Sequence, residues 1–206
     1  MEIIALKPTG FSSNCYIIHN GREAFVVDPS IGENQIKSKL DSMGLSLKAI
    51  LLTHGHFDHI WRAKELKDLT GAPLWIHELD AEMLTDSMKN AFSVFVQGSF
   101  VVGEADATFK DSDLLTLGEE KIKVIHTPGH TKGSVCFDLG HSLITGDTIF
   151  SEGFGRYDLY GGDFSALKES LKKLQEMANE CQRWIYCGHG ETSTLKSATD
   201  KLKYYF

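Results

Sequence analysis

The chain has 206 residues, of which 42% are hydrophobic and 24% are charged, and its 19 glycines far outnumber its 4 prolines. This composition is ordinary for a globular protein, so we expect residues 1–206 to form a single domain. The formal charge of −7 argues against nucleic acid and anionic membranes as partners, because both require a basic surface. No apolar run is long enough to span a bilayer and the N-terminus lacks the plan of a signal peptide, so we expect a cytoplasmic protein.

The first quarter of the chain is predicted to alternate between strands and one helix. Strands are expected at residues 3–6, 15–19 and 24–27, because each is a β-rich run that ends in turn residues. Residues 32–43 carry Ile36 and Leu40 at helical spacing and are followed by Gly44, which predicts a helix with a glycine stop. The nearly continuous apolar run at 47–52 predicts a strand that is buried on both faces.

The rest of the chain continues in the same way. Further helices are expected at residues 60–69, 78–84 and 164–178, and further strands at 74–76, 114–117, 122–126, 134–139, 142–145 and 184–187. Strand groups in both halves, with helices between them, predict two central sheets that each carry helices on the outer side. This is an α/β protein of the four-layer αβ/βα sandwich type.

The segment 86–109 fits this pattern least well. Its apolar residues are crowded into two adjoining stretches, one that ends just before Gly98 and one that lies between Gly98 and Gly103. They indicate either a helix and loop that complete the core, or an apolar lid or homodimer contact beside the functional site.

The densest cluster of chemically versatile side chains directly follows the buried strand at 47–52. Three histidines and one aspartate fall within six positions there, as His54, His56, Asp58 and His59. Chance gives this H-x-H-x-D-H pattern in about one such chain per thousand. Four ligands so close in sequence would strain one tetrahedral site, so the spacing favours two metal ions side by side.

Three more candidate ligands lie in similar places, each in a glycine-containing turn after a predicted strand. They are His130, Asp147 and His189. Because loops at the ends of a sandwich converge, we expect these side chains to meet the first cluster. The glycines allow the backbone to approach the metal ions closely.

In this order, the H-x-H-x-D-H motif, His130, Asp147 and His189 resemble the full ligand set of the metallo-β-lactamase-fold hydrolases, over nearly the whole chain. Two glycine-rich stretches, 146–150 and 155–163, are similar to the glyoxalase II-like (hydroxyacylglutathione hydrolase-like) branch. The resemblance implies that His54, His56 and His130 hold one ion, that Asp58, His59 and His189 hold the other, and that Asp147 bridges the two.

The resemblance also implies a reaction, the hydrolysis of a thioester or related acyl bond by a hydroxide that lies between two divalent ions. Metal binding lowers the pKa of water from 15.7 to about 7, so no separate general base is required. Asp58 and Asp147 are then the catalytic carboxylates. We expect zinc, with iron or manganese as alternatives, because mixed histidine and carboxylate ligands do not choose strongly among these metals.

Arg156 and Tyr157 are the predicted substrate-binding residues. A guanidinium pairs bidentately with a carboxylate, so we expect a small anionic substrate at Arg156. The resemblance implies that a basic residue here helps to hold glutathione. The sequence departs from that pattern at Asp158, where those enzymes carry a tyrosine, and only 17 residues follow His189, too few for their C-terminal helical domain.

Other functions remain open for this ligand set. A mononuclear iron dioxygenase that acts on glutathione persulfide would use two histidines and one aspartate. A lactonase or β-lactamase and a nuclease of the same superfamily are further alternatives, and the net charge argues against the nuclease. A binding module that has lost catalysis is disfavoured, because all seven ligands are present.

Several residues outside the ligand set have more ordinary expectations. We expect His77 and His126 to orient backbone or ligands, and His19 and His141 to lie at the surface. Asp28 ends a predicted strand and is either a turn former or a partner of a ligand histidine.

Overall fold

The computed structural model describes residues 1–8, 10 and 12–205, and the strands in this part form two six-stranded sheets. The first sheet has the order β1 (Glu2–Leu6), β2 (Cys15–His19), β3 (Glu23–Val27), β4 (Ser46–Leu51), β5 (Leu74–His77) and β6 (Ala107–Phe109). The second has the order β12 (Ser193–Thr194), β11 (Trp184–Cys187), β10 (Ser142–Gly146), β9 (Val135–Asp138), β8 (Glu120–His126) and β7 (Leu114–Leu117).

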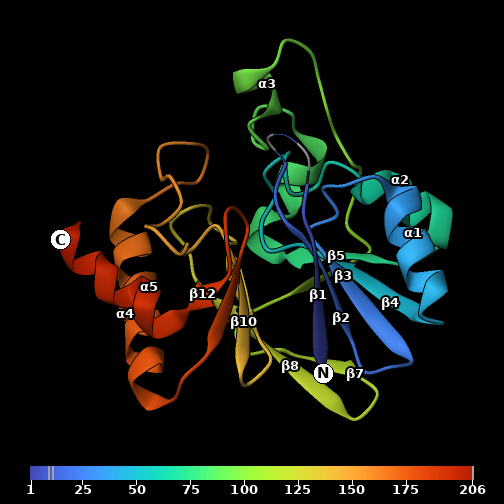
Figure 1. Ribbon diagram of the computed structural model, residues 1–206. Coiled ribbons are helices and arrows are strands. Elements are labelled where there is room, and N and C mark those ends of the chain that lie inside the picture. Colours follow the sequence, from blue (N-terminus) through green and yellow to red (C-terminus); the bar gives the residue numbers. More distant parts are fainter. Residues whose placement is uncertain (9, 11, 206) are drawn as a thin grey trace.

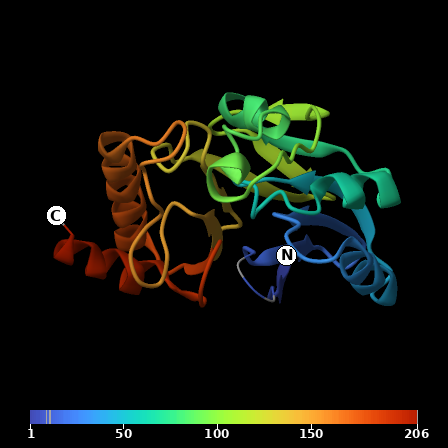
Figure 2. The same cartoon turned by 90° about the horizontal axis from the view of Figure 1, so that it is seen from above.

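Helices cover the outer faces of both sheets, and they are α1 (Glu33–Ser42), α2 (Ala63–Thr70), η1 (Glu78–Thr85), α4 (Phe164–Glu180), α5 (Leu195–Lys201) and η2 (Leu202–Tyr204). The short α3 (Phe92–Phe95) lies above the sandwich instead (Figure 1). Figure 1 shows α1 and α2 on one outer side and α4 and α5 on the other, and Figure 2 shows the same layers from above. The predicted αβ/βα sandwich is thereby confirmed. Within the described residues, no helix combines the length and apolar character that crossing a bilayer requires.

The layers follow from the two-residue period of the strands. In the first sheet, Ile17, Val26 and Ile50 pack with the outer helices, while their neighbours Ile18, Val27 and Leu51 pack between the sheets. Successive side chains of a strand point to opposite faces, so one sheet supplies two apolar surfaces. The apolar stripe of α4, which includes Leu167, Leu171 and Leu174, covers the outer face of the second sheet.

Strand direction determines where the functional residues gather. Strands β3, β4 and β5 are parallel, as are β10 and β11. Strand β8 runs the same way as β10, because both are antiparallel to β9. The loops that follow β4, β8, β10 and β11 therefore meet at one edge of the sandwich, which is where ligands bind in sheets of this kind.

Some elements differ from the sequence prediction. Helix α2 begins at Ala63 rather than at residue 60, because residues 57–62 form turns and bends, in which the amide of Ala63 donates to Ile60 only three positions back. The short elements β6, β12 and α5 were not predicted. His141 is exposed as expected, but the prediction for His19 is wrong: this side chain is buried, because β2 lies between β1 and β3.

The segment 86–109 both completes the core and projects above it. Phe92 and Phe100 stack against Trp61, at 6.1 and 4.9 Å between ring centroids. In contrast, Val94 and Phe95 on α3 are about half exposed. In Figure 1 this segment rises above the edge where the strand ends converge.

Candidate metal centre

The histidine loop lies directly between β4 and α2. The amides of His59 and Ile60 both donate to the carbonyl of His56, at 3.1 and 3.2 Å, which forms a tight turn. This turn separates His54 and His56 from Asp58 and His59. Local backbone hydrogen bonds therefore divide the motif into the two pairs of candidate ligands that we expected to face different ions.

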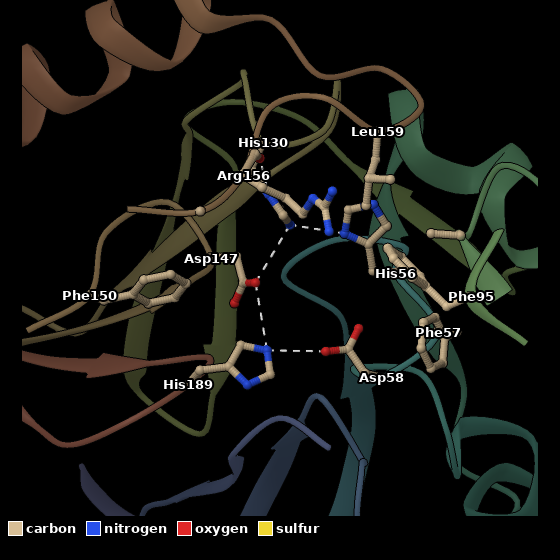
Figure 3. A pocket seen from close by; sticks show the side chains of 12 residues that line it. His56, Phe57, Asp58, Phe95, His130, Asp147, Phe150, Arg156, Leu159 and His189 are labelled. Carbon is tan, nitrogen blue, oxygen red and sulfur yellow. Dashed lines mark hydrogen bonds and ion pairs between the residues drawn. The ribbon is translucent and has the colours of Figure 1, made fainter. Parts of the chain in front are cut away.

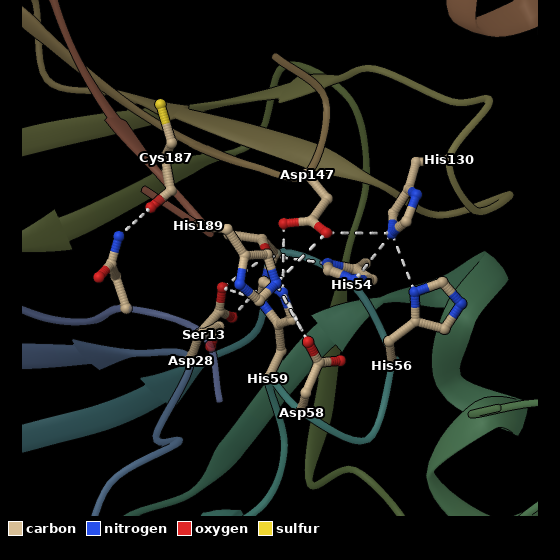
Figure 4. A network of polar contacts seen from close by, with 12 residues as sticks. Ser13, Asp28, His54, His56, Asp58, His59, His130, Asp147, Cys187 and His189 are labelled. Carbon is tan, nitrogen blue, oxygen red and sulfur yellow. Dashed lines mark hydrogen bonds and ion pairs between the residues drawn. The ribbon is translucent and has the colours of Figure 1, made fainter. Parts of the chain in front are cut away.

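Three histidines converge in the first ligand triad. The Nε2 atom of His130 lies 2.9 Å from Nδ1 of His56 and 3.2 Å from Nε2 of His54 (Figure 4). All three side chains are buried. Three ring nitrogens directed at one point form a set that suits a tetrahedral ion with one open position.

Two of the acidic candidates belong to a second group of ligands. The Nε2 atom of His189 lies 3.1 Å from an oxygen of Asp58 and 3.6 Å from an oxygen of Asp147. Asp58, His59 and His189 form a second triad whose ligand atoms lie within 4.8 Å of one another. This triad is more open, because the side chain of His189 is 36% exposed.

Asp147 lies between the two triads. One of its oxygens is 3.2 Å from Nε2 of His59, and the other is 3.6 Å from Nε2 of both His130 and His189. The first of these oxygens and Nε2 of His59 are buried, yet neither has a hydrogen-bond partner among the described residues. Two buried polar atoms that face each other without bonding fit a shared cation, so the residues present fit the metal ions that the sequence predicts.

Burial keeps the histidines of the first triad neutral. It lowers the pKa of His54, His56 and His130; the neighbouring histidines lower it further at His54 and His56, whereas Asp147 and the Arg156 carbonyl partly oppose it at His130. The pKa of His56 falls to about 3. A neutral imidazole is the form that binds a metal ion, so this triad is ready to bind at neutral pH.

The second group has the opposite electrostatics. Burial by itself raises the pKa of Asp58 and Asp147, but the charge of His59 outweighs it and lowers both. Burial likewise lowers the pKa of His59, but Asp147, Asp58 and Asp28 outweigh it and raise that pKa well above its usual value. The carboxylates thus stay ionised and attract positive charge to this point.

Each of three ligand rings uses its remaining nitrogen to hold its orientation. His59 donates through Nδ1 to Asp28 at 2.8 Å, and Nδ1 of His130 contacts the carbonyl of Arg156 at 2.6 Å. Nδ1 of His54 contacts the hydroxyl of Thr53 at 3.1 Å. Asp28 also accepts from the amide and hydroxyl of Thr53, so it partners a ligand histidine and shapes the turn at once.

Sequence reasoning missed Asp80, a fully buried carboxylate on η1. It accepts hydrogen bonds from the amides of Gly55 and Gly133, at 3.2 and 2.6 Å, and from the hydroxyl of Thr131 at 2.6 Å. Burial raises its pKa to about 6 despite these donors. Asp80 therefore ties the histidine loop to the turn that carries His130. A lone aspartate at the start of a short helix gives no sequence signal for this role.

Sequence reasoning also missed Asn14, which holds the loop of His189. Its side-chain amide donates to the carbonyls of Cys187 and Gly190, both at 3.0 Å, and its backbone amide donates to the carbonyl of Gly188 at 2.7 Å. Its partners lie more than 170 positions away in the chain. Gly188 itself must lack a side chain, because a Cβ atom there would collide with Asp147 and His59.

The predicted substrate-binding residues have different positions. Arg156 lines a cavity of about 350 Å³ that includes His56, Asp58, His130, Asp147 and His189 (Figure 3). Its guanidinium is paired bidentately with Asp158, at 2.7 and 2.9 Å. Tyr157 is not among the described residues that line this cavity, and its ring packs against Phe164 instead. His77 and His126 stack on each other at 4.3 Å, outside the ligand triads.

Comparison with known sequences shows which family this chain matches. Residues 8–189 match the metallo-beta-lactamase superfamily. An uncharacterized protein of Mycobacterium leprae is 37% identical, over 91% of this chain and 93% of that protein. The protein named hydroxyacylglutathione hydrolase GloC of Haemophilus influenzae is 30% identical, over 95% of this chain and 93% of that protein.

Solved structures agree in fold over nearly the full length. A structure described as the BLEG-1 B3 metallo-beta-lactamase is 29% identical and superposes with a TM-score of 0.88, covering 97% of each chain. TTHA1623 in a di-iron-bound form is also 29% identical, with a TM-score of 0.78 and 95% of each chain covered.

Proposed function

This chain belongs to the metallo-beta-lactamase superfamily of metallo-hydrolases, and from that premise we propose that it hydrolyses a thioester or related acyl bond with two divalent ions. One observation carries the proposal: two candidate ligand triads lie side by side with Asp147 between them, and residues of both line one cavity. Such ions, when bound, lower the pKa of water to about 7 and polarise a substrate carbonyl.

The protein's own residues prepare this chemistry. His54, His56 and His130 would hold one ion as neutral ligands, and Asp58, His59 and His189 would hold the other. One oxygen of Asp147 faces His59 and the other faces both His130 and His189, so this carboxylate contacts both triads and would offset the repulsion between two cations. Zinc, iron and manganese all suit these ligands, and TTHA1623 has been observed with two irons. The choice of zinc and the cytoplasmic location stay predictions.

The lining of the cavity favours a thioester over an amide. Among the described residues, its ionisable side chains are five metal ligands and Arg156. In thioester hydrolysis the carbonyl carbon gains a bond to the water oxygen, the carbon–sulfur bond breaks, and sulfur leaves with the electron pair. A thiolate has a pKa near 8.5 and departs without a proton donor, whereas an amide nitrogen needs one. The similarity to a relative named hydroxyacylglutathione hydrolase supports the same reaction class.

The test is a hydrolysis assay on protein whose metal content has been counted. We expect about two ions per chain and release of free thiol from thioesters at a rate well above the metal-stripped protein. Lactone, penicillin, RNA and persulfide substrates, the last with an oxygen electrode, serve as comparison arms. One iron per chain with oxygen uptake on glutathione persulfide would overturn the proposal in favour of a dioxygenase.

A further inference from the structure

Apart from the ligands, the cavity above the metal centre is mainly apolar. Phe57, Ala91, Phe95, Phe150 and Leu159 contribute to its lining. In Figure 3, Phe57 and Phe95 lie on one side of the ligand carboxylates and Phe150 lies on the other. A substrate whose scissile bond reaches the ligands therefore has apolar side chains on both sides.

Phe57 and Phe95 form an aromatic wall on one side of the cavity, and further aromatic rings hold this wall in place. Phe57 contacts Phe95 and Phe92 with centroid distances of 6.4 and 5.6 Å, and Phe92 stacks in turn on Trp61, which precedes α2. The amide of Phe57 also donates to the carbonyl of Asn90 at 3.0 Å. The wall is thus built before a ligand arrives, although Phe95 itself is 54% exposed at its rim.

Arg156, the positively charged side chain beside this wall, is already paired with an acidic side chain. Arg156 directs its Nε and one terminal nitrogen at the two oxygens of Asp158, and its guanidinium carbon lies 5.3 Å from the centroid of the Phe95 ring. A carboxylate on the substrate would have to displace Asp158 from this edge. Asp158 therefore offsets part of the positive charge of Arg156 and weakens the attraction of this side chain for an anionic substrate.

We propose that the site selects an apolar, uncharged acyl group, which packs on the wall of Phe57, Ala91, Phe95 and Leu159, and that Asp158 occupies the guanidinium that an anionic, glutathione-type substrate would use. This inference rests on the proposed function, because it names the substrate class of the same site. It assigns specificity to Phe95 and Asp158, two residues outside the ligand set.

The first experiment measures how activity depends on acyl length in the metal-loaded protein. Acetyl, butyryl and hexanoyl thioesters of N-acetylcysteamine, a neutral thiol, are compared with the succinyl thioester, which carries a carboxylate. We expect kcat/KM to rise about fourfold for each buried methylene until the cavity is full, and the succinyl thioester to be poorer than the butyryl one. Phe95→Ser should flatten this rise.

The matched control is Val94→Ser, which changes a neighbouring side chain of similar exposure that does not line the cavity. It should keep the dependence on acyl length. If Val94→Ser and Phe95→Ser behave alike, or if wild-type activity does not rise with acyl length, the inference is wrong. If the metal-loaded wild type cleaves no thioester of the panel, the proposed function itself fails.

The second experiment removes the anion that occupies Arg156. In Asp158→Asn, kcat/KM for a glutathione thioester relative to the N-acetylcysteamine thioester of the same acyl group should rise two- to fivefold, roughly the value of an exposed ion pair. Adding Arg156→Gln should cancel that gain. A wild type that already prefers the glutathione thioester, and loses this preference by tenfold in Arg156→Gln alone, would show that Arg156 binds the substrate and would refute the role of Asp158.

Discussion

The two ligand triads of this site share one cavity but differ in enclosure and charge. His54, His56 and His130 are buried, and their pKa values are lowered so that all three are neutral. The second triad contains the ionised Asp58, and His189 reaches towards solvent. If each triad holds one ion as we propose, the ion of the enclosed first triad should exchange more slowly than the ion of the second, where Asp58 adds charge and His189 is exposed. Both triads contribute to the lining of the cavity, the first through His56 and His130 and the second through Asp58 and His189.

The largest effect is expected from removing the residue that joins the two triads. Asp147→Ala should lower kcat at least about a thousandfold, the scale on which catalytic groups that act as a unit fail together. Without this carboxylate nothing between the triads offsets the repulsion of two cations, so we also expect one ion per chain instead of two. The measurement is thioester hydrolysis together with metal analysis of the same sample. A rate equal to wild type would refute the two-ion mechanism.

Changing the residues that support each triad separately tests whether the two triads bind their ions independently. Asp28→Asn weakens the hold on His59, and Asp80→Asn loosens the link between the histidine loop and the turn of His130. Asp80→Asn should weaken the ion of the first triad by about 10- to 100-fold, and Asp28→Asn should weaken the ion at His59 by a similar factor, with a smaller effect on His54 through Thr53. Cobalt-substituted protein distinguishes the two, because an all-histidine site and a carboxylate-containing site have different absorption spectra. Equal loss of both ions in both variants would show that the triads do not bind independently.

That the candidate ligands lie together could be predicted from sequence, because they all lie in loops that follow strands. His54 and His56 come just after an apolar run, and Asp147 and His189 lie in turns with adjacent glycines. Local order in the chain thus reports their common place at the ends of strands. The family resemblance added the pairing of ligands into triads.

The supporting residues could not be predicted, because their partners are remote in sequence. Asp80 bonds to residues about 50 positions away, and Asn14 to residues more than 170 positions away. The pairing of Arg156 with Asp158 could not be predicted for a different reason. Both residues were visible in the motif, but a bidentate contact two positions apart depends on the loop conformation, which the sequence does not specify.

A smaller effect is expected at the loop of the open triad. Asn14→Ala removes two side-chain hydrogen bonds to the backbone on either side of His189, each worth about 1 kcal/mol. We expect the ion of the second triad to bind up to about 30-fold more weakly, while the first ion stays in place. Competition with a chelator followed by metal analysis measures this, and Asn34→Ala, an exposed change on α1, is the control. If Asn14→Ala instead releases the buried ion first, the proposed division between the triads is wrong.

The smallest effect concerns the support behind the buried triad. His77 precedes η1, which carries Asp80, and its Nδ1 accepts a hydrogen bond from the amide of Leu79. Burial, aided by the stacked His126, lowers the pKa of His77 to about 4, although Glu78, Asp111 and Asp113 oppose this shift. The unfolded chain, with a histidine pKa near 6.5, therefore binds more protons between pH 6.5 and 4.

The free energy of unfolding should consequently fall as the pH drops from 6.5 to 4, by no more than about 1.4 kcal/mol per pH unit from this residue. His77→Gln keeps an acceptor for Leu79 but cannot be protonated, so it should make the pH dependence of stability shallower in this window. Urea unfolding of the metal-free protein at several pH values measures the slope, and His141→Gln at the exposed surface is the control. An unchanged slope in His77→Gln would mean that other groups cause the loss of stability in acid.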